Sequence, residues 1–227
     1  MTAHGAGERH ADGPGLALLD VDGTLTTVRS IWQHLLAEHG RWEGEGDVNL
    51  ARFLAGEIGY EEFCHLDAAL LAGVRYDALR AVCARVPRRP GLGELVAALH
   101  DGGYEIALVS TGLRTLTGLL VEEYGLAYCV ANDLETDGGI CTGRAVVEIG
   151  EDGKGRCAAE LVARTRPRHV VAIGDGVSDV PMLGMADTAI AVGRVPDVVR
   201  AAAGVHVADG DLRAVVPHLS PVARVRA

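Results

Sequence analysis

Residues 16–26 read LALLDVDGTLT and place two carboxylates directly after a short apolar run. The apolar residues 16–19 predict a strand that is buried on both faces. Asp20 and Asp22 follow at the strand's carboxyl end, which is where ligands bind in open parallel sheets. One such carboxylate can act as a nucleophile while the other acts as general acid and base. A calcium loop also begins D-x-D, but its twelfth position needs a carboxylate, and here that residue is Ile31.

Short apolar runs alternate with helical patterns along the rest of the chain. This alternation predicts an α/β fold with a Rossmann-like core, a parallel sheet carrying helices on both faces. The predicted strands cover residues 16–20, 104–110, 128–131, 169–174, 188–192 and 205–208. The predicted core helices cover about residues 92–101, 113–124, 155–164 and 178–185. Residues 132–149 predict a polar hairpin that turns at Gly138 and Gly139.

The gap between the first two strands predicts an inserted cap. More than eighty residues separate Asp20 from Tyr104, although a single crossover helix needs far fewer. We therefore expect residues 28–87 to form a small all-helical cap, residues 15–27 and 88–220 the catalytic core, and residues 1–14 a flexible N-terminal tail. The cap helices are expected at about residues 28–40, 47–55, 60–71 and 76–86.

The charge balance and cysteine pattern restrict the possible partners. The formal net charge is −10, so the protein is not expected to bind a nucleic acid polymer or an anionic membrane surface. No apolar run is long enough to span a bilayer. The five cysteines form no C-x-x-C pair, which argues against a zinc site and favours a reducing, cytoplasmic setting. We expect a monomer or a homodimer.

Two further motifs could bind a phosphate. Ser110, Thr111 and Gly112 follow the second strand at a helix start, where a hydroxyl and backbone N–H groups make a phosphate cradle. Serine and threonine are also ordinary helix caps, so this motif has a purely structural alternative. Lys154 is the single lysine among 21 basic residues and precedes a predicted helix, where a compact positive charge suits a phosphate. A solvated loop lysine is the alternative interpretation.

The sequence GDGVSD, residues 174–179, ends the fourth predicted strand. Asp175 and Asp179 stand four residues apart among glycines that allow close backbone approach, an arrangement that suits a hard cation such as Mg²⁺. A Gly-Asp turn with Ser178 capping the next helix is the structural alternative.

Together these motifs resemble the haloacid dehalogenase superfamily. D-x-D-G-T, then a serine or threonine, then a lysine, then G-D-x-x-x-D occur here in the family's order, and the resemblance covers about residues 15–210. The insert after the first motif resembles the helical cap of the phosphoserine phosphatase-like branch.

The resemblance implies a role for each carboxylate. Asp20 would attack phosphorus and form an aspartyl-phosphate, and Asp22 would act as general acid and base. Mg²⁺ would be held by Asp20, by Asp175 and by the backbone carbonyl of Asp22, whereas Asp179 would support this metal shell and orient Lys154.

The same resemblance implies the phosphate ligands and the reaction. The residues that would bind the phosphoryl oxygens are Ser110, Thr111, Gly112 and Lys154. Charge neutralisation and positioning supply most of the catalysis in such sites. The expected enzyme is a Mg²⁺-dependent phosphatase of a small-molecule phosphate monoester.

Substrate choice is expected to lie in the cap, which closes over the site. In the phosphoserine phosphatase-like branch, a glutamate early in the cap and a later arginine hold the ammonium and carboxylate of the amino acid. An ungapped alignment places Arg29 and Asp67 there, with both charges reversed. Asp67 also interrupts an apolar helix stripe, which is typical of a functional residue. A helix rotated to expose Asp67, or an Asp67–Arg29 ion pair, would also explain it. We therefore expect a sugar, cyclitol, nucleotide or other metabolite phosphate rather than phosphoserine.

Other activities of the same superfamily are weighed against this prediction. Asp22 argues against a dehalogenase, and the cap has no lysine to form the Schiff base of phosphonate cleavage. A phosphomutase or phosphotransferase would share all the motifs, and phosphoserine phosphatase itself stays an alternative. A binding protein with a relict site is disfavoured because every carboxylate of the motifs is intact.

Overall fold

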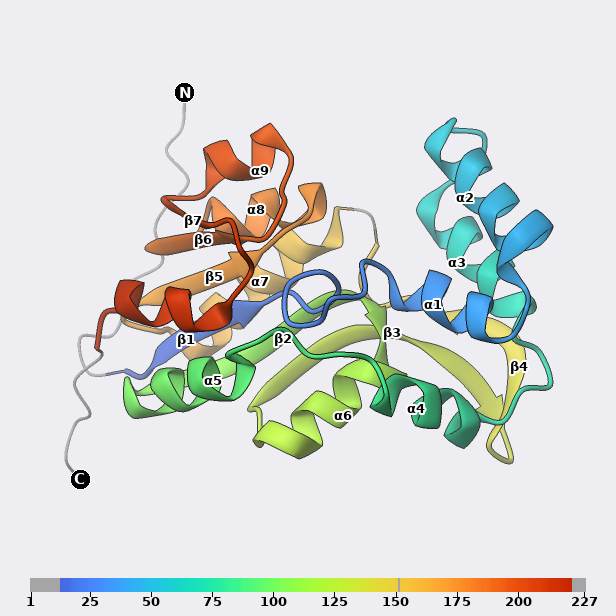
Figure 1. Ribbon diagram of the computed structural model, residues 1–227, viewed down its shortest axis with the longest axis horizontal. Helices are drawn as coiled ribbons and strands as arrows, with labels where there is room; N and C mark the ends of the chain where they lie inside the picture. The colour runs from blue at the N-terminus through green and yellow to red at the C-terminus, as the bar shows by residue number, and fades with distance from the viewer. Residues whose placement is uncertain (1–12, 151, 222–227) are drawn as a thin grey trace.

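A seven-stranded sheet organises the computed structural model, which describes residues 13–150 and 152–221. Within these residues the strand order is β4-β3-β2-β1-β5-β6-β7, and all neighbouring pairs are parallel except β3 with β4 (Figure 1). The strands are β1 (Gly15–Leu19), β2 (Tyr104–Leu113), β3 (Tyr128–Asp137), β4 (Ile140–Val146), β5 (Val170–Gly174), β6 (Thr188–Val192) and β7 (Val205–Val207). The predicted α/β core is confirmed.

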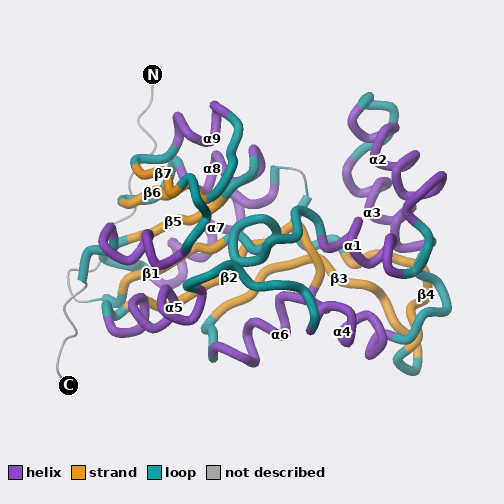
Figure 2. The backbone as a smooth tube through the Cα atoms, in the orientation of Figure 1, coloured by secondary structure: helices purple, strands orange, loops and turns teal. Residues whose placement is uncertain are grey.

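Helices cover both faces of the sheet, because β1 sends apolar side chains to both. Ala17 and Leu19 belong to one core cluster, whereas Leu16 and Leu18 belong to the other. The first face carries α5 (Leu92–Asp101), α6 (Arg114–Tyr124) and η3 (Leu212–His218). The second carries α7 (Gly153–Thr165), α8 (Val180–Leu183) and α9 (Asp197–Ala202) (Figure 2). The short 3₁₀ turn η2 (Val177–Asp179) precedes α8. Every residue of β1 is buried, which accounts for its uninterrupted apolar sequence.

The segment between β1 and α5 is helical, as expected of the predicted cap. Its elements are α1 (Ile31–Glu38), η1 (Trp42–Gly46), α2 (Asp47–Leu54), α3 (Tyr60–Ala69) and α4 (Tyr76–Ala84). Ser30 caps α1 by accepting a hydrogen bond from the Gln33 N–H at 3.3 Å. An isolated β-bridge joins Thr26 to Arg88, where the chain leaves and re-enters the core. The division at residues 28–87 stays a prediction.

The β3–β4 hairpin extends from the sheet to the helical segment. It turns at Gly138 and Gly139, whose φ values of 56° and 80° are left-handed and favour glycine. Gly73 N–H donates to the Cys141 carbonyl and Cys141 N–H donates to the Val74 carbonyl, so β4 is tied to the loop after α3. The hairpin thereby contacts the helical segment at the loop between α3 and α4.

Two expectations are corrected by this fold. β3 is one continuous strand from residue 128 into the hairpin, and α7 begins at Gly153, so Lys154 lies inside a helix rather than before one. The glycines around Lys154 favour a loop in sequence, but Gly155 is needed because a Cβ there would lie 2.7 Å from Pro181 Cβ.

Residues 1–12 of the predicted tail lie outside the described residues. No helix in the described ranges has the length and apolar character needed to cross a membrane.

Candidate active site

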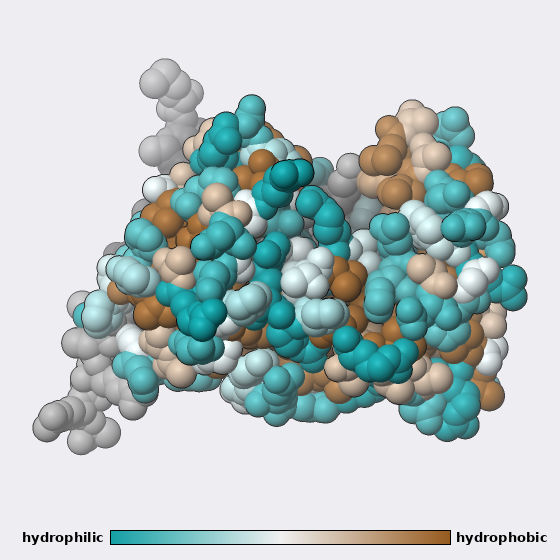
Figure 3. All heavy atoms as spheres, viewed as in Figure 1, coloured by the Kyte–Doolittle hydropathy of each residue, from teal (hydrophilic) through white to brown (hydrophobic). Residues whose placement is uncertain are grey.

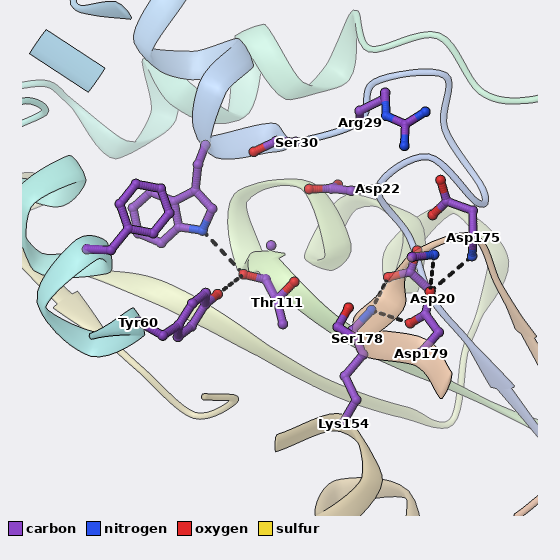
Figure 4. Close-up of a pocket in the computed structure, with 14 residues that line it drawn as sticks. Asp20, Asp22, Arg29, Ser30, Tyr60, Thr111, Lys154, Asp175, Ser178 and Asp179 are labelled. Carbon is purple, nitrogen blue, oxygen red and sulfur yellow. Dashed lines mark hydrogen bonds and ion pairs between the residues drawn. The ribbon is translucent and has the colours of Figure 1, made fainter. Parts of the chain in front are cut away.

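The predicted motifs meet at one edge of the sheet. Because β1, β2 and β5 are parallel neighbours, their carboxyl ends bring Asp20, Thr111 and Asp175 together. They line a cavity of about 240 Å³ (Figure 4). The predicted site residues that line this cavity are Asp20, Asp22, Arg29, Thr111, Gly112, Lys154, Asp175 and Asp179. In the space-filling view a notch separates the side of α2 from the side of α9 (Figure 3).

A tight turn directs Asp20 and Asp22 toward the cavity. The backbone N–H groups of Thr24, Leu25 and Thr26 all donate to the Val21 carbonyl, at 3.2, 2.9 and 3.1 Å. Gly23 has a φ of 82°, and a Cβ at that position would lie 2.4 Å from Asp175 Oδ2. Glycine is therefore needed at position 23 for two reasons: its φ is left-handed, and Asp175 leaves no room for a Cβ.

Arg89 holds this turn from the core side. Its Nε and Nη2 atoms donate to the Gly23 carbonyl at 2.9 and 2.6 Å. Arg89 has no functional role in the sequence-based prediction, because the basic residues before Pro90 indicate only the end of the predicted cap.

Lys154 is buried between two carboxylates. Its Nζ donates to Asp20 Oδ1 at 2.5 Å and to Asp179 Oδ1 at 2.6 Å, and its side chain is 2% exposed. Burial alone would lower the pKa of Lys154, but Asp20 and Asp179 outweigh it and raise the pKa. The alternative of a solvated loop lysine is wrong.

Asp179 accepts hydrogen bonds from three partners, two of them in the turn after β5. Its Oδ2 accepts the backbone N–H groups of Asp175 at 3.0 Å and Gly176 at 2.8 Å, while Oδ1 accepts from Lys154. Gly174 must be glycine, because a Cβ there would lie 2.5 Å from Asp179 Oδ2. Both oxygens of Asp179 are thus engaged, which suits a residue that orients its neighbours.

The acidic cluster fits a divalent cation. Asp20, Asp175 and Asp179 each offer an oxygen, and these atoms lie within 4.8 Å of one another. Burial raises the pKa of all three carboxyls, which reflects the cost of removing their charges from water. Lys154 balances only part of this charge. Buried carboxylate oxygens in excess of nearby cations match the ligand preference of a hard metal ion.

Asp22 points away from the acidic cluster toward α1. Its Oδ2 accepts the Ile31 backbone N–H at 2.7 Å, and its Oδ1 is buried without a hydrogen-bond partner among the described residues. Burial raises the pKa of Asp22 to about 7, although the Ile31 N–H opposes this shift. A carboxyl with such a pKa exchanges a proton readily near neutral pH.

The phosphate-binding motif has a more specific arrangement than the sequence indicated. Ser110 is fully buried beneath the cavity, and its Oγ accepts the Gly112 N–H at 3.0 Å. Trp32, Tyr60 and Asn132 all contact the Thr111 carbonyl, and sequence reasoning assigned none of them a role. The one available signal was Asn132, a polar residue at the end of an apolar strand.

The two predicted specificity residues lie in different places. Arg29 lines the mouth of the cavity near Asp175 (Figure 4). Asp67 is 1% exposed, accepts a hydrogen bond from Asn49 Nδ2 at 2.9 Å and does not line this cavity. The interpretation that α3 rotates Asp67 to solvent is wrong. No ion pair joins Asp67 to Arg29 within residues 13–150 and 152–221.

Comparison with known proteins identifies the family. Residues 17–184 match the haloacid dehalogenase-like hydrolase model. The chain belongs to this family. It is 36% identical to a phosphoserine phosphatase of Streptomyces coelicolor over 86% of this chain and 47% of that protein. It is 32% identical to a phosphoserine phosphatase of Streptococcus thermophilus over 92% of this chain and 98% of that protein.

Solved structures agree with this assignment. A structure described as a phospho-aspartyl intermediate analogue of phosphoserine phosphatase superimposes with a TM-score of 0.78 at 25% identity, covering 92% of this chain and all of that one. The chain spans about half the length of the Streptomyces coelicolor relative and of a similar Archaeoglobus fulgidus phosphoserine phosphatase.

The prediction that phosphoserine is not the substrate is wrong. Relatives that are 30–36% identical over most of this chain are named phosphoserine phosphatase. The prediction used an ungapped alignment that placed Asp67 in the substrate site. In the structure the Asp67 carboxylate faces Asn49 on α2 instead, so half of the charge-reversal argument has no physical basis.

Replacing Lys154 by methionine is expected to destabilise the fold. Lys154→Met leaves Asp20 and Asp179 buried without their shared cation, and breaking such a pair costs roughly 3–5 kcal/mol. Urea unfolding at pH 7 in the presence of a chelator measures this loss. Arg156→Met, at an exposed position of the same helix, is the control and should stay within about 0.5 kcal/mol of wild type. Equal stability of Lys154→Met and wild type would contradict the buried pairing.

The Asp67 carboxyl is expected to make stability depend on pH. Burial raises its folded pKa to about 6 from the ordinary value of 3.8. A raised folded pKa contributes stability at low pH that is lost as the pH rises from about 4 to 6. Asp67→Asn should therefore match wild type near pH 4 and exceed its free energy of unfolding by about 1–3 kcal/mol above pH 6.

Urea titrations of wild type and Asp67→Asn at several pH values test this expectation. Asp137→Asn, which replaces an exposed carboxylate in the hairpin turn, is the control. A difference for Asp67→Asn that is constant from pH 4 to 8 would show that Asp67 is not held in a desolvated position.

Proposed function

We propose that this protein is a Mg²⁺-dependent phosphoserine phosphatase that acts through a phosphorylated Asp20. The observation that carries the proposal is the buried Lys154 between Asp20 and Asp179, beside Asp175 and the phosphate-binding loop in one cavity. The relatives named phosphoserine phosphatase support the choice of substrate. The small-molecule phosphate ester is the partner that fits a cavity of about 240 Å³.

Asp20 is the proposed nucleophile. One of its carboxylate oxygens attacks phosphorus, and the bond from phosphorus to the serine oxygen breaks as the aspartyl-phosphate forms. The departing serine oxygen takes the proton of Asp22, whose buried carboxyl has a pKa of about 7 and can therefore carry that proton. The buried Oδ1 of Asp22, which lacks a partner among the described residues, is the atom available for this transfer.

Hydrolysis of the intermediate uses the same two residues in reverse. Asp22, now a carboxylate, takes a proton from water while the water oxygen attacks phosphorus. The bond between phosphorus and Asp20 breaks, which releases inorganic phosphate and restores the Asp20 carboxylate. The Ile31 N–H stays on Asp22 Oδ2 through both steps and keeps the other oxygen directed at the reacting group.

The residues around Asp20 balance the charge of the phosphoryl group. Asp20, Asp175 and the backbone carbonyl of Asp22 are the proposed ligands of Mg²⁺, which would neutralise the oxygens of the transferred group. Asp179 orients Lys154 and the Asp175 backbone. The Ser110 hydroxyl, which the Gly112 N–H holds in place, and the Lys154 ammonium are the proposed donors to the phosphoryl oxygens.

Arg29 is the proposed ligand for the carboxylate of phosphoserine. It lines the mouth of the cavity, above the carboxylates that would surround the phosphoryl group (Figure 4). A guanidinium can hold a carboxylate through two parallel hydrogen bonds. The cytoplasmic setting and the monomeric or dimeric state expected from the sequence stay predictions.

Phosphate release from phosphoserine is expected to require both Mg²⁺ and Asp20. A chelator should abolish turnover, and Asp20→Asn should lower it by roughly a thousandfold or more because the nucleophile is lost. Asp101→Asn, at an exposed position, should leave turnover unchanged. Product analysis with an added alcohol separates hydrolysis from transfer to a second hydroxyl. Metal-dependent turnover of aryl phosphate but not of phosphoserine would contradict the proposed substrate.

Removing the Arg29 side chain is expected to affect only substrates with a carboxylate. Arg29→Ala should lower kcat/KM for phosphoserine by about ten- to a hundredfold, the value of a hydrogen-bonded charge pair, chiefly through KM. Phosphoethanolamine, which lacks the carboxylate, should be hydrolysed by Arg29→Ala and by wild type equally well. Arg41→Ala in an exposed loop is the control. Equal losses on both substrates would show that Arg29 does not read the carboxylate.

A further inference from the structure

The carbonyl oxygen of Thr111 is the acceptor for three side chains from three separate elements. The Tyr60 hydroxyl on α3 donates at 3.2 Å (Figure 4). Asn132 Nδ2 on β3 donates at 3.1 Å and Trp32 Nε1 on α1 at 3.3 Å. Two of these donors belong to the inserted helices, and the third belongs to the sheet. We call these three residues and the carbonyl the Thr111 clamp.

The amide of Asn132 has one possible orientation in this clamp. Its Oδ1 accepts the backbone N–H groups of Glu148 and Ile149, both at 2.8 Å, and the residue is 0% exposed. Nδ2 therefore faces Thr111 and also lies 3.3 Å from the Tyr60 hydroxyl. Because residues 148 and 149 lead into the helix that carries Lys154, Asn132 ties the clamp to that side of the site as well.

The clamp fixes the direction of the Gly112 N–H. A trans peptide is planar, so the Thr111 carbonyl and the Gly112 N–H point in opposite directions. The Gly112 N–H donates to Ser110 Oγ at 3.0 Å, and a Cβ on Gly112 would lie 2.9 Å from Asp22 Oδ2. Donors that hold the carbonyl on one side therefore hold this N–H against the Ser110 hydroxyl on the other.

Ring packing alone does not explain the polar ends of these side chains. Tyr60 makes edge contacts with Phe53 at 5.9 Å and Phe63 at 6.4 Å between ring centroids, and a phenylalanine would make the same contacts. Burial raises the pKa of Tyr60, so its hydroxyl stays a protonated donor over the working pH range. The hydroxyl reaches past these rings to a single backbone oxygen of the phosphate-binding loop.

We propose that Trp32, Tyr60 and Asn132 are positioning residues that orient the peptide between Thr111 and Gly112 and, through its N–H, the Ser110 hydroxyl for the phosphoryl group. The proposal rests on the proposed function in one respect, that residues 110–112 bind the phosphoryl group. Because Trp32 and Tyr60 come from the inserted helices, the N–H is fully oriented only when those helices are seated on the core. Phosphate binding and seating of these helices are then coupled, each favouring the other.

The first turn of α1 extends this coupling to the acid. Ile31, adjacent to Trp32, donates its N–H to Asp22 Oδ2 at 2.7 Å. The first turn of α1 therefore holds both the Asp22 carboxyl, through Ile31, and the Thr111 carbonyl, through Trp32.

Tyr60→Phe tests the clamp while keeping the ring. Isothermal titration with inorganic phosphate and Mg²⁺ should show an affinity about two- to tenfold weaker than wild type, the worth of one hydrogen bond. The value of kcat/KM should fall by one common factor for phosphoserine and for 4-nitrophenyl phosphate, because the positioned Ser110 hydroxyl would contact the phosphoryl group that both share. Tyr104→Phe is the matched control, since the Tyr104 hydroxyl also donates to a backbone carbonyl, that of Ser220 at 2.7 Å.

Two results would overturn the proposal. Unchanged affinity for inorganic phosphate in Tyr60→Phe would show that the hydroxyl does not position the loop. A loss confined to phosphoserine would show that Tyr60 contacts the organic part of the substrate instead. If wild type fails to hydrolyse phosphoserine, the proposed function fails, and the clamp is still decided by the affinity for inorganic phosphate.

Trp32 offers a spectroscopic test of the coupling. The chain has two tryptophans, so Trp42→Phe leaves Trp32 as the only indole. Adding inorganic phosphate with Mg²⁺ should change the Trp32 emission with a midpoint equal to the calorimetric dissociation constant. Adding Tyr60→Phe to this variant should raise that midpoint by the same two- to tenfold factor. Emission that does not respond to saturating phosphate would overturn the coupling to α1.

Discussion

The buried contact of Lys154 with Asp20 and Asp179 is the interaction on which the rest of the site depends. Three carboxylates within 4.8 Å of one another repel strongly when they are removed from water, and Lys154 is the cation that makes the cluster tolerable. The fold must therefore bring a helix end to the carboxyl edge of the sheet, which α7 does. Net stability is not the purpose of such a cluster, because apolar residues would pack there at lower cost. What the arrangement provides is a fixed Asp20 carboxylate, the proposed nucleophile, in a cluster whose remaining negative charge could bind a metal ion.

Backbone geometry around the cluster follows from the same constraint. A Cβ on Gly23 would collide with Asp175, one on Gly174 with Asp179 and one on Gly155 with Pro181. Each glycine therefore allows a close approach in or around the acidic cluster. The glycines of each motif are therefore needed for packing, as the carboxylates are needed for the proposed chemistry. The family pattern D-x-D-G-T and G-D-x-x-x-D combines the groups that react with the space they need to meet.

The sequence predicts the sheet, the helices on its two faces and the core site because these features depend on local patterns. A buried apolar run defines each strand, and residues that follow strand ends meet at one edge whatever the details of packing. The position of Asp67 depends instead on how α3 rotates against α2, and a helical stripe with one carboxylate is compatible with several rotations. Asn132, Tyr60 and Trp32 escape prediction because they lie 21, 51 and 79 residues from Thr111 and meet it only in the folded chain.

The correction on phosphoserine shows where charge arguments from sequence fail. Reversed charges at two aligned positions predict a different ligand only if both side chains reach the ligand. Arg29 reaches the cavity, but Asp67 does not line it: its Oδ1 accepts from Asn49 on a neighbouring helix, and its Oδ2 is buried without a hydrogen-bond partner among the described residues. An amino-acid phosphate carries a carboxylate that a guanidinium can bind, so Arg29 is compatible with the substrate named for the relatives. If both proposals hold, the inserted segment acts on the substrate in two ways, through Arg29 at its carboxylate and through the hydrogen bonds of Trp32 and Tyr60 that position the phosphate-binding loop.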